Sequence, residues 1–424
     1  MSELRPFGAL RYDPARVDLG RVLVPPYDVI SPEDRSRLWE RDPHCAIRLE
    51  LTKDVAAEAA ADYADVRETL ARWRDERVLR LDAKPGFYGL RTRFTAPDGA
   101  QRVREGCFGL LRLEDYEKRS VRPHERTLAG PKADRLKMMQ ATDANLSSVF
   151  LLYEDRDDGL AALLESGFEK SVLAEATDEA GAQHTLMRLD EPDAAQAVAD
   201  YFAPRPLVIA DGHHRYETAL EYRNLQRRAH PDAGPDAPFE FLLVYVANAW
   251  AEGSLLLPIH RLILQAPAPD DAGWRARLPG WEMQSVRLSG PDAVPEALET
   301  HLAPLADRHA FAADDATGTL RVFARPASDE DLSVRVIHRE VIDGVFGLDE
   351  AAVRGGAIAY PKSAVQTARD LRAGQGTVAL YLNPLLPDDV FRVTAAGDVL
   401  PQKSTFFAPK LPTGLVFRLI GDAA

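Results

Sequence analysis

The 424-residue chain has only two cysteines, Cys45 and Cys107. Two thiols exclude a disulfide scaffold and a zinc site of four thiolates within one chain. The sequence also lacks three familiar site motifs: the loop G-x-x-x-x-G-K-[ST], the fingerprint G-x-G-x-x-G after a strand, and the elbow G-x-S-x-G. A phosphate site in this chain must therefore be built in another way.

Long apolar runs are missing as well. No run approaches the length of a membrane span, and the first twenty residues hold no apolar segment of signal-peptide length. Basic side chains are fewer than acidic ones: the chain has 52 lysines and arginines and 66 acidic residues, which give a net charge of −14. Such a charge disfavours binding to DNA or to anionic membranes. Together with the scarcity of cysteine, this predicts a cytoplasmic enzyme that binds neither nucleic acid nor membrane, and it leaves the oligomeric state open.

The chain does have ample apolar material, 46% of its residues, which suffices for two or three domains or subdomains. Strand and helix patterns alternate, which predicts an α/β (α+β) fold with a mixed-sheet core. We expect residues 1–264 to form an N-terminal α/β core. An acidic stretch rich in Ala and Pro, 265–349, predicts an inserted α+β subdomain, and 350–424 is expected to return to the core.

One stretch, ADGHHR at 210–215, concentrates polar side chains between the apolar run 207–210 and a segment without Gly or Pro, 218–225. This pattern predicts a strand, a tight turn and a helix. A helix N-terminus presents unpaired N–H groups and favours anions, Gly212 lets a ligand approach the backbone, and Arg215 offers a planar fork for phosphate. We therefore predict a phosphate-binding turn.

Two plainer interpretations of this turn stay open. The histidines His213 and His214 can simply cap a helix, or Asp211 and a histidine can ligate a metal ion. The metal interpretation is the weaker one, because adjacent helix residues point about 100° apart and cannot easily share one ion.

Two further polar segments are candidates. The segment RPHERTLAGPKADRL is either a solvated charge run or a site in which a carboxylate is balanced by cations; its candidates are His124, Glu125, Lys132 and Arg135. The segment QKSTFFAPKLPTG is either a structural loop or an oxyanion-binding loop; its candidates are Lys403, Ser404, Thr405 and Lys410. In PPYDVIS, Asp28 can place one carboxylate at a strand end.

Four motifs in order, VPPYDVIS, HERT followed by KADRL, ADGHHRYETAL and PQKSTFFAPKLPTGL, resemble those of the DUF1015 family, a bacterial and archaeal family of unknown function. This resemblance runs from about residue 7 to residue 418. It carries no mechanism, although an association of family members with serine metabolism favours serine or phosphoserine as the substrate.

The stretch ADGHHRYETAL also resembles the turn of the ParB and sulfiredoxin superfamily. There the turn lies at a helix N-terminus and holds nucleotide phosphates, and some members phosphorylate free serine. The resemblance implies that residues 212–215 cradle phosphate, and that Asp211 orients the turn or faces a metal.

These observations together predict a phosphoryl-transfer enzyme that acts on a small hydroxylated metabolite, with free serine and phosphoserine as the leading pair. Arg215 would hold the phosphate, a histidine with a pKa near neutrality would donate a proton to the leaving oxygen, and Glu125 or Asp28 would accept one. Mg²⁺ and a nucleotide, ATP or ADP, are the expected cofactors. The alternatives are a phosphatase that uses the same residues and a non-catalytic protein that binds a phosphorylated metabolite.

The location of Asp211 argues against it as the base. The helix dipole and Arg215 would hold its carboxylate ionised, so we predict a low pKa for Asp211 and expect it to be a poor proton acceptor. The predicted base is therefore Glu125, and Asp28 is the next candidate.

Overall fold

The structure is a computed structural model that describes residues 2–125, 129–327, 331–401 and 403–421. The chain divides into two compact units, each with its own sheet and core. The first comprises 1–255, 394–398 and 409–424, and the second 256–393 and 399–408. Every helix in the described ranges is too short or too polar to cross a lipid bilayer.

The first unit is built on a sheet that has nine strands in the described ranges, with the order β6-β11-β8-β12-β5-β4-β10-β9 and β1 beside β5. Its strands are β1 (Leu4–Arg5), β4 (Phe87–Thr95), β5 (Gln101–Arg112), β6 (Val121–Arg122), β8 (Val149–Tyr153), β9 (Val172–Thr177), β10 (Gln183–Leu189), β11 (Leu207–Asp211) and β12 (Phe241–Asn248). Strand β11 runs parallel to β6 and β12 parallel to β8, whereas the other pairs are antiparallel. The predicted mixed sheet is therefore confirmed.

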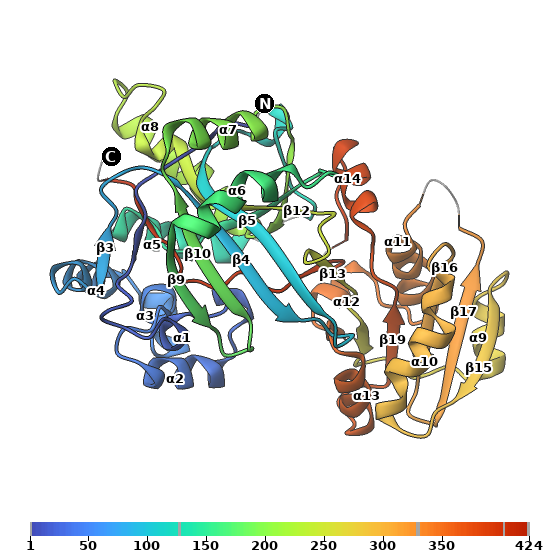
Figure 1. Cartoon of the computed structure of the whole chain (residues 1–424). Coiled ribbons are helices and arrows are strands. Elements are labelled where there is room, and N and C mark those ends of the chain that lie inside the picture. The colour runs from blue at the N-terminus through green and yellow to red at the C-terminus, as the bar shows by residue number, and fades with distance from the viewer. Residues whose placement is uncertain (1, 126–128, 328–330, 402, 422–424) are drawn as a thin grey trace. The chain divides into compact units, whose positions relative to one another are not determined.

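The apolar composition of β12 explains why this strand lies in the middle of the sheet. All eight residues of β12, FLLVYVAN, are buried, as expected of a strand covered on both faces. Helices α6 (Gly159–Lys170), α7 (Pro192–Phe202) and α8 (His213–Ala229) contribute apolar side chains to the core of this sheet, and Figure 1 shows α6 and α7 lying against it.

A second core in this unit forms beside the sheet, where Trp73, Tyr12 and Phe417 pack together. Its helices include α2 (Pro32–Arg41), which follows the N-cap residue Ser31 and has a proline at its first position. The other elements of the unit are β2 (Leu10–Tyr12), α1 (Leu19–Val22), η1 (Tyr27–Val29), α3 (Ile47–Glu50), η2 (Val55–Ala60), α4 (Ala64–Asp75), β3 (Leu79–Leu81), η3 (Tyr116–Lys118), α5 (Ala129–Thr142), β7 (Ala144–Asn145), η4 (Pro238–Glu240) and β21 (Arg418–Leu419). The short strand β13 (Leu255–Leu257) crosses the boundary between the units.

The second unit holds an antiparallel sheet that has six strands in the described ranges, in the order β15-β17-β16-β19-β14-β18. Its elements are β14 (Arg261–Ile263), α9 (Asp271–Arg277), β15 (Glu282–Arg287), η5 (Pro291–Ala293), α10 (Val294–His301), η6 (Ala303–Leu305), β16 (His309–Asp314), β17 (Thr319–Arg325), α11 (Ser333–Ile337), η7 (His338–Asp343), α12 (Glu350–Arg354), β18 (Ile358–Ala359), α13 (Ala364–Arg372), β19 (Val378–Leu382), α14 (Pro387–Ala395) and β20 (Phe406–Ala408). Helices α10 and α13 share one core with the sheet. Trp274 of α9 packs on Phe311 and Phe323.

Candidate functional site

The predicted strand, turn and helix are present. Strand β11 ends at Asp211, Gly212 adopts the left-handed conformation with φ 93°, and α8 begins at His213. A Cβ at position 212 would lie 2.9 Å from Arg215 Nε and would require a strained backbone. The turn therefore depends on glycine, and a 17-residue helix follows it whose first N–H groups have no acceptor within the helix.

Asp211 binds two cations. Its Oδ2 accepts a 2.5 Å hydrogen bond from Arg215 Nη2, and its Oδ1 accepts one of 2.5 Å from Lys410 Nζ. Burial opposes ionisation of this carboxyl, but Lys410 and Arg215 outweigh it and hold the pKa at about 2. The predicted low pKa of Asp211 is confirmed, so this residue is a counter-ion and not a proton acceptor near neutral pH.

Two buried histidines lie next to the turn, with ring centroids 4.5 Å apart. The backbone N–H of His124 donates to Nε2 of His213 at 3.3 Å. In the neutral ring the proton therefore lies on Nδ1, which is 3.7 Å from Glu125 Oε1. His213 thus presents an N–H toward the carboxylate that the sequence indicates as the base.

The expectation that His213 or His214 has a pKa near neutrality is wrong. Burial, reinforced by His124, lowers the pKa of His213 well below its ordinary value. Burial is also the main cause that lowers the pKa of His124 and that of His214. Imidazoles that stay neutral donate hydrogen bonds at neutral pH, and they are poor sources of a proton.

Glu125 reaches the site from the loop after β6, the strand that pairs in parallel with β11. Its side chain is 29% exposed, so the carboxylate is accessible from solvent while it faces His213. The neighbouring residues 126–128 lie outside the described ranges. From α5, Lys132 Nζ pairs with Glu217 Oε2 of α8 at 2.6 Å, which brings the second polar segment against the helix of the turn.

Arg135 has partners within the protein. Its Nη1 donates to the carbonyl of Glu50 at 2.9 Å and lies 3.4 Å from the carboxylate of Glu50, while the guanidinium lies 4.4 Å from the ring centroid of Tyr27. Burial raises the pKa of Glu50, although the charges of Arg135 and Arg215 act to lower it. This geometry indicates a positioning role for Arg135.

Sequence analysis missed Glu50, which is 1% exposed. The available signal was an acid between Leu49 and Leu51 in the apolar run AIRLEL, since a charge flanked by core residues is typical of a buried ion pair.

Asp28 is exposed on η1 and belongs to the same electrostatic environment. Burial lowers the pKa of His214, and Asp28 is among the carboxylates that counteract it. Asp28 also helps to raise the pKa of Arg215 against the effect of burial. The motifs at 25–28, 124–132 and 211–217 therefore converge with Lys410 inside the first unit.

The late motif is divided between the units. Lys403, Ser404 and Thr405 belong to the second unit, whereas Lys410 belongs to the first. Ser404 is buried and donates from Oγ to the carbonyl of Pro401 at 2.6 Å. The role of residues 403–405 in phosphate binding stays a prediction. In the described ranges, no three His, Cys, Asp or Glu side chains lie close enough together to hold a metal ion.

The family model described as "Protein of unknown function (DUF1015)" matches residues 4–278, which is more than half of the chain. This chain belongs to the DUF1015 family. The resemblance inferred from the motifs is therefore confirmed, although the match does not extend to residues 403–410. A search of curated proteins finds no match.

Several solved structures are similar at low identity. A conserved hypothetical protein from Pyrococcus furiosus is 13% identical, with 70% of this chain and 91% of that chain covered and a TM-score of 0.32. A mutant free serine kinase in complex with ADP is 13% identical, with 70% and 89% covered and a TM-score of 0.35. SbnI from Staphylococcus aureus with a C-terminal truncation is 12% identical, with 73% and 86% covered and a TM-score of 0.35.

Proposed function

We propose that this protein transfers a phosphoryl group between a nucleotide and the hydroxyl group of a small metabolite, with free serine and phosphoserine as the leading pair. One observation carries the proposal: the two cations Arg215 and Lys410 share a single carboxylate, that of Asp211, at the N-terminus of α8. The carboxylate of Glu125 faces the same helix start through His213.

The proposed phosphate-binding part of the site is inferred from the positive groups at the start of α8. Two cations contact the carboxylate of Asp211 at the turn, and the N–H groups at the helix start add positive potential. Gly212 lets a phosphate approach the backbone closely, and a guanidinium makes charge-assisted contacts with phosphate oxygens. These features support binding of the transferred phosphoryl group against residues 212–215, with Lys132 as a further cation beside α8.

The part of the site that binds the metabolite must also accept the proton of its hydroxyl group. When the hydroxyl oxygen of the metabolite attacks phosphorus, the bond from phosphorus to the bridging oxygen of the donor breaks and the hydroxyl proton must leave. Glu125 is the group that we assign to accept it, because its carboxylate is accessible and lies 3.7 Å from His213 Nδ1 at the helix start. Asp211 is excluded by its pKa of about 2, and Asp28 is the second candidate.

Mg²⁺ and a nucleotide, ATP or ADP, belong to this proposal. In phosphoryl-transfer sites Mg²⁺ is commonly held by one or two carboxylates and by the substrate phosphates, not by a cage of protein ligands. The accessible carboxylate of Asp28 fits that mode and leaves Glu125 to accept the proton. The ion, when bound, neutralises charge on the phosphates.

The test is to incubate the full chain with Mg²⁺ and serine in the presence of ATP, ADP or no nucleotide, and to follow phosphorus by NMR. We expect a phosphomonoester resonance of phosphoserine that requires one of the nucleotides, and the reverse transfer from phosphoserine. Release of inorganic phosphate from phosphoserine without nucleotide would identify a phosphatase instead. Binding of phosphoserine without any turnover would identify a binding protein.

A further inference from the structure

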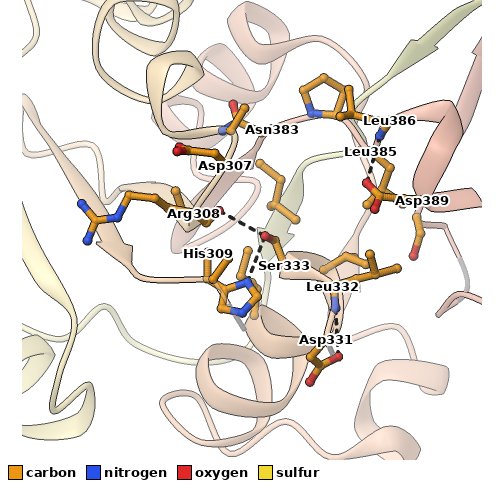
Figure 2. A pocket seen from close by; sticks show the side chains of 18 of the residues that line it. Asp307, Arg308, His309, Asp331, Leu332, Ser333, Asn383, Leu385, Leu386 and Asp389 are labelled. Atoms are coloured by element: carbon orange, nitrogen blue, oxygen red, sulfur yellow. Dashed lines mark hydrogen bonds between the residues drawn. The ribbon is translucent and has the colours of Figure 1, made fainter. Parts of the chain in front are cut away.

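The second unit contains a cavity of about 270 Å³ whose lining residues all belong to that unit (Figure 2). It lies where β16 begins at His309 and β19 ends at Leu382, and α11 and the start of α14 contribute to its wall. Small-molecule sites typically have about 300 Å³ or more, so this cavity suits a small metabolite.

Most of the charged groups around the mouth are paired with a group of opposite charge. Arg308 pairs with Glu282 through two hydrogen bonds, of 2.8 and 3.0 Å. The other pairs are Arg392 with Asp389 at 2.9 Å and Arg339 with Asp331 at 2.8 Å. Asp307 lines the cavity as well and adds a negative charge beside Arg308, so the arginines of the mouth already have acidic neighbours.

Arg261 lines the same cavity and is different. It is 3% exposed, and its guanidinium donates to the carbonyl of Ile259, which is also part of the lining. The guanidinium lies 5.3 Å from the ring centroid of Tyr360, and it forms no ion pair with a carboxylate of the described ranges. Burial lowers its pKa to about 10. A buried cation without a counter-ion is unfavourable, and a bound anion would remove that penalty.

The rest of the wall is partly aliphatic and partly polar, and Asn383 and Ser404 are among its polar residues. Leu332, Ile337, Leu382, Leu385 and Leu386 contribute to its aliphatic part, and Figure 2 shows Leu332 beside Ser333, with Leu385 and Leu386 near Asp389. Ser333 Oγ lies 3.1 Å from His309 Nδ1, so this polar pair is already bonded. An occupant of this cavity needs one anionic group and an apolar body.

We propose that this cavity binds a small carboxylic acid whose carboxylate pairs with Arg261 and whose aliphatic body packs against these leucines. A carboxylate carries one negative charge, which matches one guanidinium, and an aliphatic body gains from contact with the leucines of the wall, which inorganic phosphate does not. This site is separate from the proposed phosphoryl-transfer site and does not depend on it.

The test is calorimetry on the full chain with 4-methylpentanoate, its neutral amide and inorganic phosphate. We expect saturable binding of the acid and at least about tenfold weaker binding of the amide, because only the acid compensates Arg261. Arg261→Gln should remove this preference. Equal affinities for the acid and its amide, or no saturable binding of the acid up to about 10 mM, would overturn the proposal, as would displacement of the acid by phosphate.

Two further variants keep the test decisive where Arg261→Gln fails to fold. Leu386 is 57% exposed at the cavity, so Leu386→Glu should fold and should weaken binding of the acid by repulsion, but not binding of the amide. Lys410→Gln removes a cation from the other unit and should leave the affinity for the acid unchanged. A loss of acid binding in Lys410→Gln, with none in Leu386→Glu, would place the acid at the other site and contradict the proposal.

Discussion

Lys410 and Asp211 are 199 positions apart in the sequence and are joined by a 2.5 Å hydrogen bond from Nζ to Oδ1. The same C-terminal segment supplies β21, which pairs with β7 in the first unit. The end of the chain therefore completes the turn at the start of α8. A site assembled in this way depends on the folded first unit and not on the local motif alone.

We expect Lys410→Gln to weaken binding of phosphoserine or ADP by about 1.5 to 3 kcal/mol, because a charge-assisted contact to phosphate is lost. Calorimetry measures this change. The matched control is Lys137→Gln on α5, where the lysine is exposed, and it should bind as the wild type does. Unchanged affinity in Lys410→Gln would remove this lysine from the site.

We expect Arg215→Ala to weaken binding of the same ligands by about 2 to 4 kcal/mol and also to lower the melting temperature. The second effect arises because Asp211 loses one of its two cations and the carbonyl of Ser148 loses its donor. Arg215→Lys should recover part of the stability but not the affinity, since an ammonium lacks the planar fork. Equal affinity in the lysine variant and the wild type would contradict a guanidinium contact with phosphate.

The assignment of the base is tested by Glu125→Gln. The amide keeps the size of the side chain but cannot accept a proton, so turnover should be abolished while phosphoserine still binds. The control is Glu117→Gln, an exposed acid on η3, which should retain full turnover. If Glu125→Gln keeps near-normal turnover, the base lies elsewhere, and Asp28→Asn is the next variant to measure.

The parts of this molecule that could be predicted from the sequence are those that local pattern determines. The apolar run 207–210, the glycine at 212 and the uninterrupted segment after it specify the strand, the turn and the helix, and the charges on that turn predict the low pKa of Asp211. Long-range contacts were not predictable in this way. The burial of Glu50 under Arg135 depends on packing between segments 85 positions apart, and β19 pairs with both β14 and β16, which no local pattern specifies.

Burial of His213 predicts a pH dependence of stability. Its pKa in the folded chain lies well below the value of about 6.5 expected in the unfolded chain, so the unfolded state binds more protons in the interval between the two values. Stability is therefore highest above about pH 6.5 and falls as the pH decreases below it.

The variant that tests this dependence is His213→Gln, which cannot titrate. We expect the melting temperature of the wild type to decrease between about pH 6.5 and pH 5, and the decrease to be smaller in His213→Gln. His124 and His214 also have lowered pKa values, so a residual slope should remain in the variant. The control is His230→Gln near the exposed end of α8, which should follow the wild type. Identical slopes in His213→Gln and the wild type would show that His213 is not held neutral by burial, and its 3.7 Å contact with Glu125 would then have to be reconsidered as an ion pair.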